Sequence, residues 1–241
     1  MNHFFESKHL LLNSKDKFLP SILLNNVIFG YYDGKIKILL KKLMIYDKWM
    51  LPEGFIYKTE SVEEAAYRAL KENIGIDNIL LTQFHVFGEI NRLYSKVDKN
   101  ILNQRYVSIG YYAFVNYSKV KMFCNEKEEI RWFDINKLPK LYGDHNKIIN
   151  TAIFEICKYI NHIPIGYELL PEKFTMSELR LIYEAFLGEN LDRRNFQRKM
   201  LSMGFINKLN EKSEKRGIKP TILYSFKKDK YMKCLMQFLK L

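Results

Sequence analysis

The sequence GFIYKTESVEEAAYRALKENIGI, residues 54–76, decides the fold of the first half of this 241-residue chain. It predicts a helix after Ser61, because Ser61 can cap the helix and Glu64, three residues later, can complete a capping box. Gly75 is expected to end the helix. Alanine and leucine residues recur on one side at helical spacing, so this side is expected to pack against a sheet.

Strand patterns surround this helix. Residues 22–32 and 35–43 alternate in polarity and are rich in β-branched and aromatic side chains, and Asp33-Gly34 between them signals a hairpin turn. Further strands are expected over 83–87, 105–116 and 130–133, followed by a helix over about 145–161. This order of elements predicts a mixed α/β sandwich.

The chain is expected to divide into two domains. Segment 162–174 holds two prolines and a glycine and breaks the helical pattern, so we interpret it as a linker. An N-terminal domain then covers residues 1–161, and a C-terminal domain covers residues 175–241.

The C-terminal domain has the order of elements of a winged helix. Two helices separated by a few residues that include glycine indicate a helix-turn-helix. Helices are expected over 175–187 and 192–203, and strands over 205–209 and 221–226 around a charged loop, 211–217.

Positive charge is concentrated in this second domain. The whole chain has a net charge of +12, and residues 191–233 hold 13 Lys and Arg against 4 Asp and Glu. Clustered cations gain free energy by displacing counterions from phosphates, which indicates a polyanionic partner. A merely basic surface remains the alternative on charge alone.

The second helix of this domain carries the candidate DNA-reading residues. Phe196 and Met200 recur at helical spacing and are expected in the core, which leaves a basic side facing outward. Arg can bind guanine edges and Gln can bind adenine, so this side fits the major groove of double-stranded DNA, and the wing fits phosphate contacts. The expected DNA-binding residues are Arg193, Arg194, Asn195, Gln197, Arg198, Lys199, Lys215, Arg216 and Lys219. A solvated helix face or a protein-interaction module are the alternatives.

Cysteine usage and hydropathy exclude several classes of protein. Cys124, Cys157 and Cys234 are far apart and odd in number, which suits neither a disulfide framework nor a zinc site, so we expect reduced core residues. No apolar run approaches the roughly 18 residues that span a bilayer, and the first residues lack the apolar core of a signal peptide. We therefore expect a cytoplasmic protein.

Residues 54–76 resemble the Nudix hydrolase box: Gly, five residues, Glu, seven residues, then Arg-Glu-apolar-x-Glu-Glu-x-Gly-apolar. The positions that match are Gly54, Glu60, Arg68, Leu70, Glu72, Gly75 and Ile76. The resemblance implies the Nudix α/β/α sandwich over about residues 20–160. Ala69 and Asn73 depart from it, because each stands where the family has a glutamate.

Those two glutamates hold the metal ion in active members of the family. Magnesium needs oxygen ligands, and pyrophosphate hydrolysis needs the metal, whereas Ala69 supplies no ligand. We therefore expect no catalytic residues, no metal and no cofactor, and we interpret Arg68 and Glu72 as an ion pair. An active Nudix hydrolase remains the alternative, because Glu60 and Glu72 are kept and Glu53 could approach the metal.

The whole chain is similar to the Nudix-related transcriptional regulators, in which a Nudix-like domain precedes a winged helix. The likeness is carried by Trp132-Phe133, Leu138-Pro139, Asp144-His145, Leu169-Leu170-Pro171, Phe174-Thr175, 181–184 and 191–196. One branch of that family responds to ADP-ribose-type ligands. Another, common in Bacteroidetes, responds to sugars, and the loss of the glutamates is similar to that branch.

The resemblance implies a homodimer that binds a near-palindromic DNA operator and a small-molecule effector, either a sugar or an ADP-ribose-like metabolite. The expected effector-binding residues are Glu53, Phe87, Glu89, Arg92, Arg105, Tyr112 and His145. A structural hydrogen bond is an equal alternative for His145. Segment 163–174 is the expected hinge between effector and DNA binding.

Overall fold

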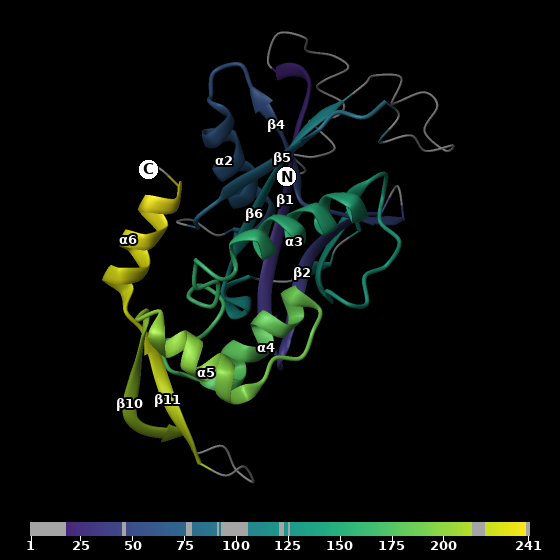
Figure 1. Ribbon diagram of the computed structural model, residues 1–241. Coiled ribbons are helices and arrows are strands. Elements are labelled where there is room, and N and C mark those ends of the chain that lie inside the picture. The colour runs from purple at the N-terminus through teal and green to yellow at the C-terminus, as the bar shows by residue number, and fades with distance from the viewer. Residues whose placement is uncertain are drawn as a thin grey trace.

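The computed structural model describes residues 18–44, 47–75, 79–90, 92, 106–120, 123–124, 126–213 and 220–239, with backbone alone for 18–21, 123–124 and 238–239. Figure 1 shows a sheet with helices in its upper part and a small helical part with a two-stranded wing below it. None of the described helices is long and apolar enough to cross a membrane.

An eight-stranded mixed sheet forms the N-terminal part. Its main path runs β5-β6-β1-β2-β8-β7, with β3 paired to β2 and β4 paired to β1. Strand β1 is central, because it runs antiparallel to β2 and β4 and parallel to β6. The strands are β1 (Phe18–Tyr32), β2 (Lys35–Leu43), β3 (Lys48–Met50), β4 (Glu53–Tyr57), β5 (Thr82–Phe87), β6 (Val107–Phe114), β7 (Phe123–Cys124) and β8 (Glu128–Asp134).

Helices cover both faces of this sheet. Because side chains alternate along a strand, Leu24 of β1 packs with α2 (Val62–Ile74), whereas Val27 packs with α3 (His145–Tyr159). A short 3-10 helix, η1 (Tyr117–Lys119), follows β6. The arrangement confirms the predicted α/β/α sandwich.

The local signals around the first helix are confirmed. The Ser61 hydroxyl accepts a hydrogen bond from the Glu64 backbone N–H at 3.2 Å, and Glu64 accepts one from the Ser61 backbone N–H at 2.8 Å. Gly75 ends α2 with a φ of 70°, in the left-handed region that favours glycine. Asp33 and Gly34 both have positive φ, as a tight hairpin turn between β1 and β2 requires.

The C-terminal part is a winged helix. Helix α4 (Met176–Leu187) is capped by Thr175 and ends at Gly188, and α5 (Arg193–Ser202) is capped by Asp192. Its three-stranded sheet has the order β10-β11-β9. The strands are β9 (Phe174–Thr175), β10 (Ile206–Ser213) and β11 (Thr221–Phe226), and a last helix, α6 (Lys228–Leu239), follows.

Three features of this part differ from the sequence-based expectation. Strand β9 was not predicted, because two residues are too few to show an alternating pattern. Strand β10 continues to Ser213, into the residues expected as loop. Its charged side chains are solvent-exposed, so this part of the strand lacks the alternation of apolar and polar residues that predicts a strand. Helix α6 was also not predicted.

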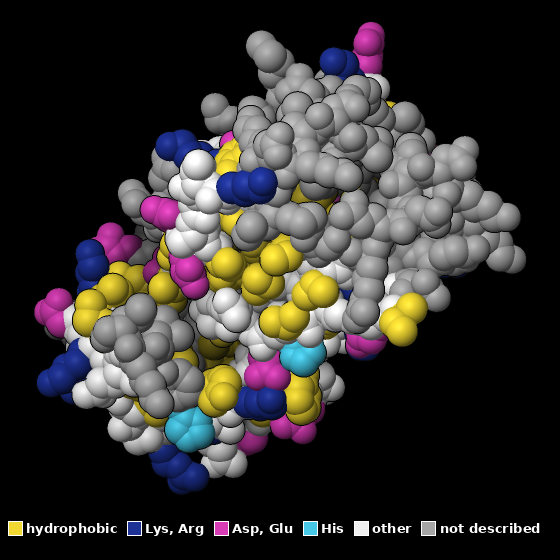
Figure 2. Space-filling view, turned by 90° about the horizontal axis from the view of Figure 1, so that it is seen from above, with side chains coloured by type: hydrophobic (Ala, Val, Ile, Leu, Met, Phe, Trp, Pro, Cys, Tyr) yellow, Lys and Arg dark blue, Asp and Glu magenta, His cyan; other side chains and the backbone are white. Residues whose placement is uncertain are grey.

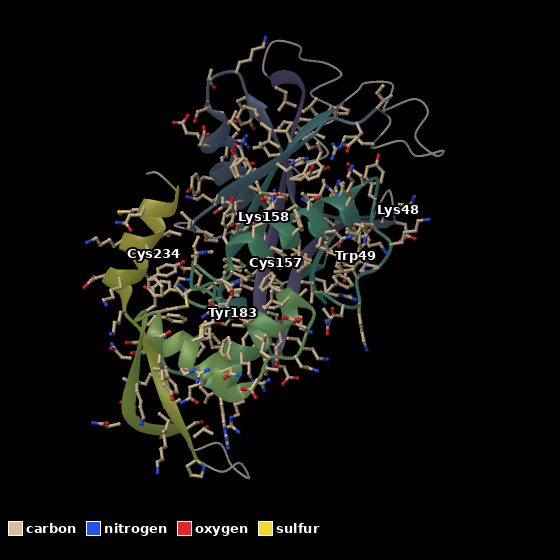
Figure 3. The ribbon with its side chains drawn as sticks, in the orientation of Figure 1. Lys48, Trp49, Cys157, Lys158, Tyr183 and Cys234 are labelled. Atoms are coloured by element: carbon tan, nitrogen blue, oxygen red, sulfur yellow. The ribbon has the colours of Figure 1, made fainter. Side chains whose placement is uncertain are left out.

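The two parts share one hydrophobic core. The ring of Phe186 on α4 lies edge-on to Phe29 of β1 at 5.3 Å and to Phe114 of β6 at 5.9 Å between centroids. The Cys157 thiol on α3 donates to the Phe186 carbonyl oxygen at 3.1 Å. Figure 3 shows Cys157 on α3 and Tyr183 on α4 at this junction.

The expected linker is packed into this core. Ile165, Leu169 and Leu170 are buried, and Phe174, fully buried, belongs to β9. A hinge at 163–174, like the domain limits drawn from it, stays a prediction, and any hinge motion there would have to unpack these side chains.

The cysteines are less buried than expected. Cys157 and Cys234 are free thiols and only half-buried. The side chain of Cys124 lies outside the described residues.

Candidate functional site

Helix α5 presents a basic side to solvent. Phe196 and Met200 are buried, which confirms their core position, and the Phe196 ring lies edge-on to Tyr183 at 5.1 Å. Asp192 caps the helix by accepting a hydrogen bond from the Asn195 backbone N–H at 2.8 Å. These contacts fix the rotation of α5 about its axis. The exposed residues on its outer side include Arg193, Arg194, Asn195 and Arg198.

The remaining DNA-binding candidates differ in where their side chains point. Arg198 donates to the Asn195 side-chain oxygen at 2.9 Å, so Asn195 orients an exposed guanidinium. Gln197 is half-buried and donates to the Tyr224 hydroxyl on β11 at 3.3 Å. Lys199 donates to the side-chain oxygen of Asn161 at 2.6 Å. Gln197 and Lys199 are therefore engaged within the protein.

The wing carries further positive charge. Lys208 and Lys212 are exposed on β10, whereas three predicted DNA contacts, Lys215, Arg216 and Lys219, lie outside the described residues.

Figure 2 views the end of the molecule remote from α5 and the wing, where Lys and Arg side chains are interspersed with acidic and hydrophobic ones.

Arg68 joins the loop and the helix of the Nudix-like box through hydrogen bonds. Its guanidinium donates to both carboxylate oxygens of Glu60 at 2.8 and 2.6 Å, to Glu72 at 2.9 Å and to the Phe55 carbonyl oxygen at 2.6 Å. It also lies over the Tyr57 ring, 4.1 Å from the centroid. Burial opposes its charge, but the hydrogen bonds and charges of Glu60 and Glu72 raise the pKa of Arg68 above its ordinary value. The predicted ion pair between Arg68 and Glu72 is confirmed.

Several effector-binding candidates gather at the start of α3. Arg92 is almost fully buried and forms a two-pronged ion pair with Asp144, with both distances 2.9 Å, and donates to the Ser108 hydroxyl at 2.6 Å. The buried ring of Phe87 lies 6.0 Å from the Arg92 guanidinium. Glu89 pairs with Lys147 of α3, and this hydrogen bond lowers the pKa of the Glu89 carboxyl.

His145 lies at the same helix start and has a structural hydrogen bond. It is fully buried, and its Nδ1 accepts the Leu51 backbone N–H at 2.9 Å. This contact supports the structural alternative for His145 and holds β3 and β4 to α3. Two residues after Leu51, Glu53 is buried and accepts a hydrogen bond from the Asn25 side-chain amide at 3.3 Å.

Tyr112 lies apart from the other candidates. It is four residues beyond Ser108 on β6, about 13 Å along the strand. It lines a cavity of about 210 Å³ between the sheet, α3 and α6, together with Glu168 and Tyr231. Burial raises the pKa of the Glu168 carboxyl despite the opposing charges of Lys119 and Lys228. Arg105 lies outside the described residues.

Each of the two parts matches a known protein family. Residues 27–152 match the NUDIX domain, and residues 166–226 match the NrtR DNA-binding winged helix domain. The chain belongs to the NrtR-type family.

Two relatives of this NrtR-type chain differ in how much of it they match: one covers most of its length and the other about half. It is 28% identical over 214 residues to the ADPR responsive transcriptional repressor NtrR of Acinetobacter baylyi, covering 86% of this chain and 82% of that one. It is 30% identical over 131 residues to an ADP-ribose pyrophosphatase of Methanocaldococcus jannaschii, covering 54% of this chain and 71% of that one. The crystal structure of Shewanella oneidensis NrtR complexed with a 27mer DNA superimposes with a TM-score of 0.70 at 23% identity, covering 88% and 95% of the two chains, which confirms the fold.

The box of this NrtR-type chain does not fit the metal ion of Nudix hydrolases. Ala69 has no side-chain atom that can bind a metal ion. The Asn73 amide nitrogen donates hydrogen bonds to the carbonyl oxygens of Glu53 at 3.1 Å and Ala69 at 2.7 Å. Glu60 and Glu72 are held by Arg68. In the part of the chain that the structure describes, no group of three or more His, Cys, Asp or Glu side chains is placed to hold a metal ion.

Sequence reasoning missed the buried polar residues that support the site. Lys41, Asn25 and Ser108 lie within apolar strands, and all three are buried. A polar residue inside an otherwise apolar strand is the signal that could have found them, since burial of a polar group without a partner is costly.

Proposed function

We propose that this chain is a DNA-binding transcription regulator whose Nudix domain binds a small-molecule effector and has lost hydrolysis. The observation that carries the proposal is the pair of exposed arginines Arg194 and Arg198 on the second helix of the winged helix, on the side away from the buried Phe196, with the exposed Arg193 beside them. The name of the Acinetobacter relative, a transcriptional repressor, supports it. Such a regulator acts in the cytoplasm.

In this proposal α5 enters the major groove of operator DNA. Arg194 and Arg198 contact base edges or phosphates, and the hydrogen bond from Asn195 directs the Arg198 guanidinium. Lys208 and Lys212 on β10, with the wing residues Lys215, Arg216 and Lys219, contact phosphates. A homodimer would place two such helices on the half-sites of a near-palindrome.

The effector is ADP-ribose-like or a sugar. The name of the Acinetobacter relative supports ADP-ribose, whereas the sugar alternative rests on the lost glutamates. The pocket is proposed at the start of α3, beside Arg92, Glu89 and His145. Because α3 packs against α4 of the winged helix, a ligand there can favour one arrangement of the two parts, provided that its affinity differs between arrangements.

DNA binding is tested by fluorescence anisotropy with the chain's own promoter region and unrelated DNA, each over a salt series. Arg198→Ala should weaken promoter binding by about 1–3 kcal/mol if Arg198 reads a base, and lower the salt slope by about 0.9 if it contacts a phosphate. Lys48→Ala is the matched control, because it removes one exposed positive charge from β3, far from α5 (Figure 3).

Two results would contradict the proposal. One is no binding to any duplex at low salt, and the other is equal loss of binding in Arg198→Ala and Lys48→Ala. The effector is sought by thermal shift with pentoses, hexoses, sugar phosphates and ADP-ribose, since a ligand that binds the native state raises its melting temperature.

A second candidate function is hydrolysis of ADP-ribose. The identity to the Methanocaldococcus ADP-ribose pyrophosphatase and the retained Glu60 and Glu72 favour it. Incubation with ADP-ribose and Mg²⁺, followed by chromatography of the products, distinguishes the two candidates. Steady release of AMP that is lost in Glu72→Gln would support the enzyme and overturn the proposal of lost hydrolysis.

A further inference from the structure

Lys41 is a charged residue buried between the sheet and α2. Strand β2 places its side chain on the same face as Leu39, and the residue is 6% exposed. Its ammonium lies 2.7 Å from Glu128 Oε2 on β8 and 3.2 Å from Asn73 Oδ1 on α2. A buried ammonium needs such oxygen partners, because it loses the solvation that water provides.

The Asn73 side chain is held so that its oxygen faces this ammonium. Its amide nitrogen donates to the carbonyl oxygens of Glu53 and Ala69, so both amide hydrogens have acceptors. The Asn73 oxygen is then directed at Lys41. Helix α2 and strand β4 thus fix a neutral oxygen ligand beside the positive charge of Lys41.

This arrangement occupies the helix face that holds the metal ion in active Nudix hydrolases. Ala69 and Asn73 replace the two glutamates, and residues four apart on a helix share one face, so both positions point to the same side of α2. Two negative charges are therefore absent from this face, and the Lys41 ammonium, which is paired with Glu128, faces it. A divalent ion placed there would be repelled by the ammonium without the carboxylates that normally offset its charge.

We propose that the Lys41 ammonium takes the place of the divalent metal ion, so that this domain is assembled, and binds its effector, without metal. Metal-free effector binding rests on the proposed function, whereas replacement of the metal ion by the Lys41 ammonium does not. Lys41 is a positioning residue, because it acts by holding α2 to the sheet through Asn73.

The first test measures binding of Mn²⁺ by electron paramagnetic resonance. Ala69→Glu/Asn73→Glu restores both glutamates and keeps Lys41, which would pair with them. Adding Lys41→Met frees the same carboxylates for the metal, so we expect this triple variant to bind Mn²⁺ at least tenfold more tightly than the double variant or the wild type. Equal affinity in the double and triple variants would overturn the proposal, as would wild-type binding as tight as that of the triple variant.

The second test needs only single substitutions and decides the matter if the triple variant does not fold. Lys41→Met leaves the oxygens of Glu128 and Asn73 facing an apolar side chain, so its melting temperature falls, and millimolar Mn²⁺ should restore part of the loss. Lys42→Met is the matched control, because Lys42 points to the opposite face and pairs with Asp47 at 2.5 Å. Stabilisation of wild type by Mn²⁺ would contradict the proposal, and so would rescue that is equal in both variants or absent from Lys41→Met.

The third test measures the dissociation constant of ADP-ribose in EDTA and in Mg²⁺. We expect the two values to agree within twofold, because no metal bridges protein and ligand. Binding that requires Mg²⁺ overturns the inference and leaves the regulator proposal standing. Absence of binding in both conditions counts against ADP-ribose as the effector, and the Mn²⁺ experiments still decide the exchange of cations.

Discussion

Replacing Phe186 with alanine removes the ring that joins the winged helix to the Nudix sheet. Phe186 belongs to α4, is buried, and lies edge-on to Phe29 and Phe114 of the sheet. If these contacts hold the two parts together as one unit, their loss should lower overall stability and uncouple unfolding of the two parts.

The expected cost follows from the size of the cavity that the substitution creates. A buried Phe replaced by Ala costs about 3–5 kcal/mol, and two edge-on ring pairs of about 0.5–1.5 kcal/mol each are part of it. For a chain of this length, each kcal/mol lowers the melting temperature by roughly 2–4 °C, so a fall of about 6–20 °C is expected. That is a large fraction of the roughly 5–15 kcal/mol that stabilises a native protein.

Differential scanning calorimetry measures both effects. Wild type should unfold in one transition, and Phe186→Ala should show a lower or split transition. Phe154→Ala is the matched control, because Phe154 lies on α3 with 62% of its surface exposed and should change stability by no more than about 0.5 kcal/mol. An equal effect of the two substitutions would refute the idea that the ring of Phe186 couples the two parts.

Three further predictions concern local packing, capping and pH. Gly54→Ala would place a Cβ 2.5 Å from the Ala69 Cβ on α2, so it should destabilise by about 1–3 kcal/mol in thermal denaturation, whereas Gly88→Ala, with its nearest neighbour at 3.8 Å, should not. Thr175→Ala removes the cap of α4 and should cost about 0.5–2 kcal/mol in urea unfolding; no change in the urea midpoint would contradict this role of the cap. Burial raises the pKa of Tyr111 to about 12, above the unfolded value near 10, so its contribution to stability is complete below pH 10 and is lost as the pH rises toward 12. The fall in unfolding free energy over this range, measured by chemical denaturation, should be shallower in Tyr111→Phe.

The sequence determined the features that depend on neighbouring residues. Ser61 and Glu64 specify the start of α2, and Gly75 specifies its end, because a cap is a hydrogen bond between residues three apart and a left-handed residue favours glycine. Asp33-Gly34 likewise specified the hairpin. The spacing of the box residues predicted the Nudix fold, and the pattern of buried Phe196 and Met200 predicted the core side of α5.

Only the tertiary structure decided which distant residues meet. Lys41 and Asn73 are 32 residues apart and come together because β2 turns Lys41 toward α2, and a shift of one residue in strand register would turn it to the other face. Arg92 and Asp144 are 52 residues apart and meet because the start of α3 packs beside the segment that follows β5. Side-chain pairing of this kind depends on how whole helices and strands pack together, so the residues close in sequence do not predict it.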